Sequence, residues 1–121
     1  MMYYLYYKFK YSSIDNRAII KASCSGDIKF LEWFKNSSYE FNDVECAINY
    51  ASVNGHIQVL EWFKNSGYEF KYNKRAIYRA SENGHVQVLE WFKNSGYEFE
   101  YSKDLIKMVS FFWIYSSFRM V

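Results

Sequence analysis

The residues that could perform chemistry are two histidines and two cysteines. His56 and His85 each follow an Asn-Gly pair, whereas Cys24 and Cys46 occupy unrelated positions. Imidazole and thiolate groups are ligands that zinc prefers, but a zinc site needs further ligands at suitable spacing. No carboxylate or thiol completes such a set. The spacing therefore predicts that each histidine begins a helix and bonds to a neighbouring turn, and that both cysteines are ordinary thiols. We expect no metal and no cofactor.

Glutamates recur with the same step that separates the two histidines, at Glu32, Glu61 and Glu90. A catalytic carboxylate is usually singular, so this recurrence argues against a catalytic role. The chain also has no Gly-rich phosphate loop, no nucleophile elbow and no acid pair. The sequence thus predicts a non-enzymatic protein that acts on no small-molecule substrate.

The elements that carry these residues belong to an internal repeat. The hexapeptide Glu-Trp-Phe-Lys-Asn-Ser occurs at 32–37, 61–66 and 90–95, and residues 47–75 match residues 76–104 at 22 of 29 positions. A fixed period of this size is typical of arrays in which each unit buries its apolar face against its neighbours. We therefore divide the chain into three units, 18–46, 47–75 and 76–104.

Each unit reads as helix, tight turn, helix and extended return. In the third unit, Ala76, Ile77 and Ala80 fall on one helical face, and Asn83-Gly84 ends that helix. The second helix has a wide apolar face formed by Val86, Val88, Leu89, Trp91 and Phe92. Residues 97–101 alternate aromatic and charged, which predicts an extended segment. We expect the tryptophans (Trp33, Trp62, Trp91) to pack in the core and the aromatic residues of the returns to pack between units.

Residues 83–92, Asn-Gly-His-Val-Gln-Val-Leu-Glu-Trp-Phe, resemble the core of the ankyrin repeat, and Gly-Tyr-Glu-Phe at 96–99 resembles the segment that follows it. The unit is similar to the shortened ankyrin repeats of giant DNA viruses of amoebae. The resemblance implies an all-α, ankyrin-like helix-turn-helix solenoid that binds proteins, here a host-cell protein. Ankyrin units have about 33 residues and a Thr-Pro-Leu-His tetrad, whereas this chain has 29-residue units and Arg-Ala-Ile-Tyr at 75–78. We expect short connecting loops in place of β-turn fingers.

The two ends depart from the repeat. Residues 1–17 form a degenerate N-terminal segment, in which Phe9-Lys10-Tyr11 echoes Phe70-Lys71-Tyr72 and predicts an extended return whose rings cover the first unit. Residues 105–121 resemble an incomplete fourth repeat with an apolar tail, because Trp113 stands where Gly84 would end the helix. This tail raises two alternatives to protein binding by the repeats. One is docking to a membrane interface or a partner through the tail, and the other is a truncated repeat array without selected function.

The candidate contact residues are the exposed positions at which the copies differ. Most lie on the first helices, off the Ala/Ile/Ala face, or in the connecting segments. In an ankyrin-like stack this is the concave surface that binds a partner, although any exposed position is also free to drift. The predicted partner-binding residues are Lys21, Asn49, Tyr50, Lys71, Arg75, Tyr78, Arg79, Glu82 and Glu100.

Composition limits the remaining classes. Fifteen basic and 13 acidic residues give a net charge of +2, which offers no electrostatic basis for nucleic-acid binding. Two cysteines do not make a disulfide scaffold, and there is no signal-peptide pattern. The longest apolar stretch falls short of the roughly 18 residues that span a membrane. We expect an intracellular, cytoplasmic protein, in the host cell if it is viral.

Overall fold

The computed structural model describes residues 2–37 and 39–97. Within these ranges the chain is all-helical, as the sequence predicts, with no strand. The helices are α1 (Met2–Tyr11), α2 (Asn16–Ser25), α3 (Ile28–Asn36), α4 (Val44–Val53), α5 (Ile57–Asn65), α6 (Lys74–Glu82) and α7 (Val86–Asn94). The predicted incomplete repeat at 105–121 lies outside the described residues, as does Glu100.

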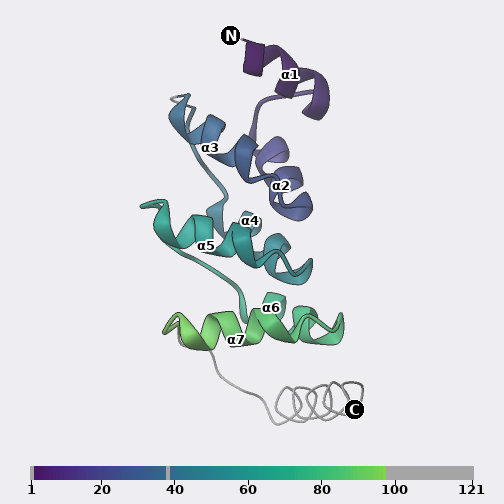
Figure 1. The fold of residues 1–121 in the computed structure, drawn as a ribbon, viewed down its shortest axis with the longest axis vertical. Coiled ribbons are helices and arrows are strands. Elements are labelled where there is room, and N and C mark those ends of the chain that lie inside the picture. The colour runs from purple at the N-terminus through teal and green to yellow at the C-terminus, as the bar shows by residue number, and fades with distance from the viewer. Residues whose placement is uncertain (1, 38, 98–121) are drawn as a thin grey trace.

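The helices stack in two rows (Figure 1). The first helix of each pair packs on the first helix of the next, in the order α2, α4 and α6, and the second helices follow in the order α3, α5 and α7. Within each pair, the two helices also contact each other. The face of the first row that points away from the second helices is therefore formed by three neighbouring helices.

The helices α4 and α6 end at the Asn-Gly turns that the sequence predicts, and side-chain caps mark the starts of α2 and α6. The carboxylate of Asp15 accepts a hydrogen bond from the backbone N–H of Arg17 at 2.9 Å, and Asn73 caps α6 in the same way through Arg75. Gly26 follows α2 with a φ of 82°, a left-handed conformation that glycine adopts without steric cost. The Asn-Gly pairs after α4 and α6 reverse the chain in the same way, through glycines at φ 77° and 83°.

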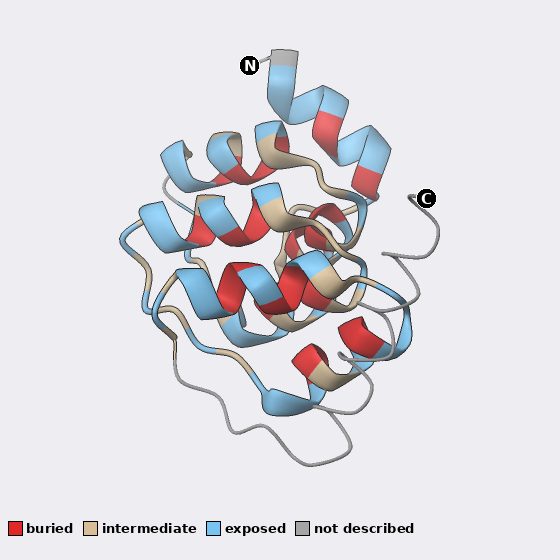
Figure 2. Ribbon diagram, turned by 60° about the horizontal axis from the view of Figure 1, so that its bottom comes forward, coloured by how far each residue is buried: buried red, intermediate tan, exposed pale blue. Residues whose placement is uncertain are grey.

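The core repeats along the stack because equivalent apolar positions are buried in each pair (Figure 2). Small residues of the first helices face large residues of the second, which lets the two rows approach closely. The tryptophans differ from the expectation, since Trp33 and Trp62 are only half-buried at the edge of the core and Trp91 alone is buried. Besides Trp91, the buried apolar residues of the three helix pairs are Ala18, Ile19, Ala22, Phe30, Leu31, Phe34, Ala47, Ile48, Ala51, Val59, Leu60, Phe63, Ala76, Ile77, Ala80, Val88, Leu89 and Phe92.

The connecting segments 39–43 and 69–73 contain neither helix nor strand. The rings of Phe41 and Phe70 pack against the next helix pair, as predicted, whereas the ring of Tyr39 packs on the preceding helix α3. The ring of Phe41 lies 5.7 Å from Phe63 and 4.6 Å from Tyr68, and the ring of Phe70 stacks on Tyr97 at 4.4 Å. These contacts tie each helix pair to the one that follows.

The N-terminal segment is a helix, so the prediction of an extended return over residues 1–13 is wrong. Tyr7 and Tyr11 lie one turn apart on α1, and their rings pack 5.0 and 4.6 Å from the ring of Phe30. Tyr7 also lies 5.0 Å from Trp33. A helix places aromatic residues at this spacing on one face, whereas an extended chain with spacing i, i+4 would separate them by about 13 Å. The expectation that these rings cover the first helix pair is confirmed.

Candidate interaction surface

The outer side of the row formed by α2, α4 and α6 carries most of the predicted contact residues. We define it as the first-helix face, made of Arg17, Lys21, Cys46, Asn49, Tyr50, Val53, Arg75, Arg79 and Glu82. Lys21, Tyr50 and Arg79 occupy equivalent positions of the repeat on the three helices, and all three are exposed. Because α2 packs on α4 and α4 on α6, these three residues follow one line across the helices.

A groove of about 290 Å³ lies between α4 and α6 on this face. It is lined by Cys46, Asn49, Tyr50, Val53, Asn73, Arg75, Ala76 and Arg79. Four of the predicted contact residues are thus brought together: Asn49, Tyr50, Arg75 and Arg79. All the lining residues except Ala76 occupy positions at which the sequence copies differ.

Asn49 also has a structural role. Its side-chain oxygen accepts a hydrogen bond from the backbone N–H of Asn73 at 2.8 Å, which fixes the connecting segment just before α6. The carboxamide oxygen of Asn73 caps α6, and both asparagines line the groove. The sequence predicts Asn49 as an exposed contact residue, whereas the structure has it half-buried with its side-chain oxygen bonded to the backbone.

The remaining predicted residues lie outside the groove. Tyr78 is half-buried and packs against the core, so less of its ring is available to a partner. Lys71 lines a separate hollow of about 420 Å³ between two connecting segments, and its ammonium lies 3.5 Å from Glu69. Lys21 and Glu82 are exposed on α2 and α6.

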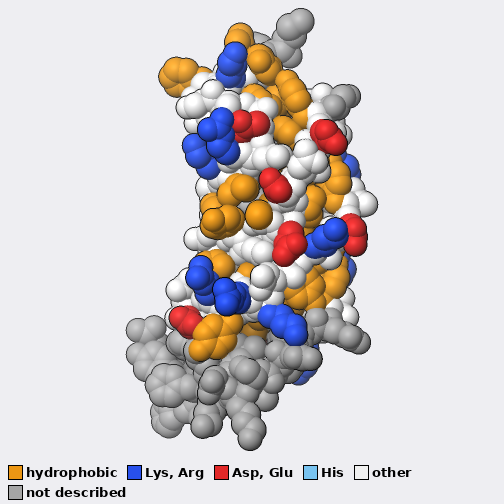
Figure 3. Space-filling view, turned by 180° about the vertical axis from the view of Figure 1, so that it is seen from behind, with side chains coloured by type: hydrophobic (Ala, Val, Ile, Leu, Met, Phe, Trp, Pro, Cys, Tyr) orange, Lys and Arg blue, Asp and Glu red, His pale blue; other side chains and the backbone are white. Residues whose placement is uncertain are grey.

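The cations of the face differ in their pairing. Arg17 forms an ion pair with Asp15 at 3.1 Å, and this bond lowers the pKa of the Asp15 carboxyl. Over residues 2–37 and 39–97, the charged groups of Lys21, Arg75 and Arg79 have no ion-pair partner. Figure 3 shows Lys and Arg side chains gathered at separate levels of the stack, with a hydrophobic patch between them.

The recurring glutamates bond the recurring tryptophans, which the sequence reasoning missed. The indole N–H of Trp62 donates to Glu32 at 2.6 Å, and that of Trp91 donates to Glu61 at 2.7 Å. Each bond joins one second helix to the next. The available signal was that Glu and Trp recur together, since residues that pair between units must be copied together.

The histidines precede the first residues of α5 and α7, as predicted, and their rings lie against the turns of the preceding helix pairs. The predicted bond is not found, since neither ring forms a hydrogen bond to a turn within the described residues. A Cβ atom built on Gly26 would lie 3.1 Å from Nδ1 of His56, and one built on Gly55 would lie 2.6 Å from Nδ1 of His85. Glycine is therefore required at the turn both for its backbone conformation and for the space that the next ring fills. Across the part of the chain that the structure describes, no three His, Cys, Asp or Glu side chains are grouped as metal ligands.

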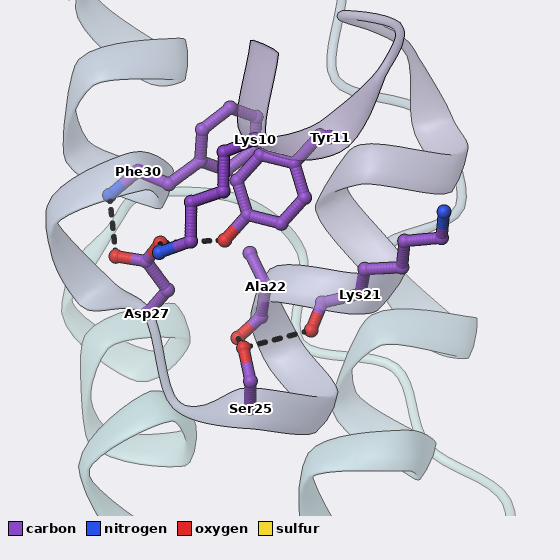
Figure 4. A network of polar contacts seen from close by, with 7 residues as sticks. All are labelled: Lys10, Tyr11, Lys21, Ala22, Ser25, Asp27 and Phe30. Carbon is purple, nitrogen blue, oxygen red and sulfur yellow. Dashed lines mark hydrogen bonds and ion pairs between the residues drawn. The ribbon is translucent and has the colours of Figure 1, made fainter. Parts of the chain in front are cut away.

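Asp27 occupies the histidine position of the first helix pair and anchors α1 (Figure 4). Its carboxylate accepts hydrogen bonds from Lys10 Nζ at 2.8 Å, from the Tyr11 hydroxyl at 2.5 Å and from the Phe30 backbone N–H at 3.2 Å. Partial burial raises the pKa of Asp27, but the bonds from Lys10 and Tyr11 outweigh it and the net pKa is lowered. Burial and the bond to Asp27 raise the pKa of Tyr11.

Comparisons of the chain with known protein families, with functionally characterised proteins and with solved structures found no match. Among the helices that the structure describes, none has the length and apolar character that crossing a membrane requires. The first-helix face itself is therefore the basis for inferring a function.

Proposed function

We propose that the chain is a non-enzymatic protein-interaction module, an ankyrin-like solenoid of 29-residue units that binds a partner protein through the first-helix face. The observation that carries this proposal is the composition of the groove between α4 and α6. Copies 47–75 and 76–104 are identical at 22 of 29 positions, yet nearly every residue that lines the groove lies at a position where copies differ. The core residues are the same in both copies, whereas the residues of the groove differ. This is the pattern expected when one fold is kept and its binding surface changes.

The residue types on the face support the same proposal. Tyr and Arg are enriched among the residues that dominate binding energy at protein interfaces. Tyr50 is 49% exposed although it is a large aromatic residue, and Arg75 and Arg79 flank it across the groove. A rigid row of helices also holds these side chains in place before a partner arrives, which reduces the entropy lost on binding.

The proposed partner is a host-cell protein, which the chain would bind in the host cytoplasm. This part of the proposal rests on the resemblance of residues 83–99 to the shortened ankyrin repeats of giant DNA viruses of amoebae. The near-neutral charge of the chain also favours a protein over a nucleic acid as the partner.

The experiment is affinity capture from an amoebal lysate with quantitative mass spectrometry. Three full-length baits are compared: the unchanged chain, Tyr50→Ala/Arg79→Ala, and the control Lys64→Ala/Lys93→Ala on the exposed side of α5 and α7. We expect proteins captured by the unchanged chain to be lost with the first variant and retained with the control. Equal capture by all three baits would reject the first-helix face as the binding surface.

A further inference from the structure

We propose that the groove between α4 and α6 takes an acidic, extended segment of the partner protein, with one carboxylate held between Arg75 and Arg79. This inference rests on the proposed function and specifies the chemistry of its partner. It is carried by the arrangement of unpaired cations and exposed apolar surface on the first-helix face.

Arg75 and Arg79 lie one helical turn apart on α6, and both line the groove. Neither guanidinium has an ion-pair partner among the described residues. A guanidinium presents a planar set of donors that matches a carboxylate with two parallel hydrogen bonds. The two guanidinium groups, at positions i and i+4 of α6, therefore form a site that can bind one or both oxygens of a carboxylate.

The opposite wall of the groove is apolar at its exposed edge. Tyr50 and Val53 come from α4, and the ring of Tyr50 is half-exposed. A bound segment with only acidic side chains would leave the apolar surface of Tyr50 and Val53 exposed to water. An apolar or aromatic residue next to the acid would bury that surface. We thus assign the groove to a segment that carries both kinds of side chain.

The line from Arg79 through Tyr50 reaches Lys21 on α2, a third cation that has no ion-pair partner within residues 2–37 and 39–97. Packed helices lie about 8–10 Å apart, so Lys21 and Arg79 are separated by about 16–20 Å across two helix spacings. An extended chain advances about 3.3 Å per residue. The segment that fits has two acidic residues about five or six positions apart, with an apolar residue between them over Tyr50.

The acidic groups of the same helices do not occupy this path. Glu82 lies at the end of α6, and Glu45 lies in the first turn of α4. Neither lines the groove, and Asp15 is already paired with Arg17. The electrostatic attraction along the groove therefore comes from Arg75 and Arg79.

The experiment is a selection of random twelve-residue peptides displayed on phage against the full-length chain, with no assumed ligand. Selected peptides are synthesised, and their affinities are measured by fluorescence anisotropy for the unchanged chain and for Arg75→Glu/Arg79→Glu. The control Lys64→Glu/Lys93→Glu changes the net charge by the same amount on α5 and α7. Both substituted pairs lie at exposed positions, and circular dichroism checks that each variant folds.

We expect the selected peptides to be rich in Asp and Glu about five or six positions apart. Binding should weaken at least about tenfold in Arg75→Glu/Arg79→Glu, remain in the control, and return when the peptide acids are replaced by lysine. Selected peptides are also measured with Tyr50→Ala. Neutral peptides whose binding is lost in Tyr50→Ala would overturn the acidic partner and leave the proposed function standing. If no peptide is enriched, or if peptides bind all variants equally, the acidic-segment proposal fails, and the capture experiment with the three baits decides the proposed function separately.

Discussion

The indole nitrogen of Trp91 donates a 2.7 Å hydrogen bond to the carboxylate of Glu61, which joins α7 to α5. Trp91 is buried to 9% exposure, so its N–H depends on this acceptor. The equivalent bond between Trp62 and Glu32 lies closer to solvent, because Trp62 is only half-buried. The same pair of residue types therefore experiences two different environments along the stack.

Replacing Glu61 by Ala should lower the free energy of unfolding by about 1–2 kcal/mol, since a buried donor is left unsatisfied. Glu32→Ala should cost less, because water can reach the indole of Trp62. Urea unfolding of the two variants measures the difference. A double-mutant cycle of Glu61→Ala with Trp91→Phe should show a coupling of about 1 kcal/mol, and no coupling would mean that the bond does not stabilise the stack.

Replacing Gly55 by Ala should be more destabilising than replacing Gly67 by Ala. Both glycines have a positive φ, 77° and 90°, and a left-handed residue other than glycine costs about 1–2 kcal/mol. Only at Gly55 would the new Cβ meet a side chain, 2.6 Å from Nδ1 of His85, whereas no described atom lies within 4 Å of a Cβ on Gly67. Thermal unfolding of both variants separates the backbone strain from the clash.

The clash at Gly55 should be relieved by His85→Ala in the same chain. The double variant should recover the part of the loss that exceeds the Gly67→Ala value. If it unfolds at the same temperature as Gly55→Ala alone, the ring of His85 does not fill the turn.

The attachment of α1 should weaken in acid. The pKa of Asp27 is lowered in the folded chain, so the carboxylate contributes stability above its ordinary pKa of about 4 and loses it as pH falls through the lowered value. Proteolysis of residues 2–11 should accelerate over this range. Asp27→Asn keeps a helix-capping oxygen but cannot titrate, so its cleavage rate should be fast at neutral pH and change little between pH 5 and pH 2.

The same ion pair predicts the behaviour in base. The bond to Asp27 raises the pKa of Lys10, so its contribution is complete below the ordinary value of about 10.5 and is lost as pH rises through the raised value. In Asp27→Asn, the rate of proteolysis of residues 2–11 should show neither the rise in acid nor the rise in base. A variant that retains either rise would assign the pH dependence to other groups.

Two aromatic residues of α1 provide a matched pair for stability. Tyr7 is 5% exposed and packs on Phe30, whereas Phe9 is 92% exposed. Tyr7→Ala should therefore lower the free energy of unfolding by about 2–4 kcal/mol or release α1 from the stack. Phe9→Ala should change it by less than about 0.5 kcal/mol. Equal losses measured by urea unfolding would show that α1 does not cover the first helix pair through Tyr7.

The parts of the fold that could be predicted from sequence are those whose residue pattern occurs in more than one copy. Ala76, Ile77 and Ala80 share a helical period with their copies, and the Asn-Gly pairs mark the same stop, so the helices follow from local rules. The N-terminal helix has no copy to compare. The helical conformation of α1 depends on the contact of Tyr7 with Phe30, and all of α2 lies between these two residues in the chain. No local sequence pattern reveals such a contact.

The candidate site was predictable in its exposure but not in its shape. Positions such as Tyr50 and Arg79 lie off the apolar face, and this alone places them outside the core. Membership of the groove depends on how α4 and α6 lie against each other, and the bond from Asn73 to Asn49 joins α4 to the residue that caps α6. Tyr78 lies one position before Arg79 and is half-buried, because a shift of about 100° around a helix is enough to turn a side chain toward the core.

The Glu–Trp and Gly–His contacts that join neighbouring helix pairs each link residues 30 positions apart. Glu32 meets Trp62 as Glu61 meets Trp91, and Gly26 meets His56 as Gly55 meets His85. Unequal recombination that deletes 47–75 would therefore leave every junction with the residue types that it needs, since Glu32 would face Trp91 and Gly26 would face His85. The same event would bring Lys21 beside Arg79 and remove Tyr50. Under the proposed function, such a deletion would change the contact surface in one step while keeping the Glu–Trp and Gly–His pairs that join neighbouring helix pairs.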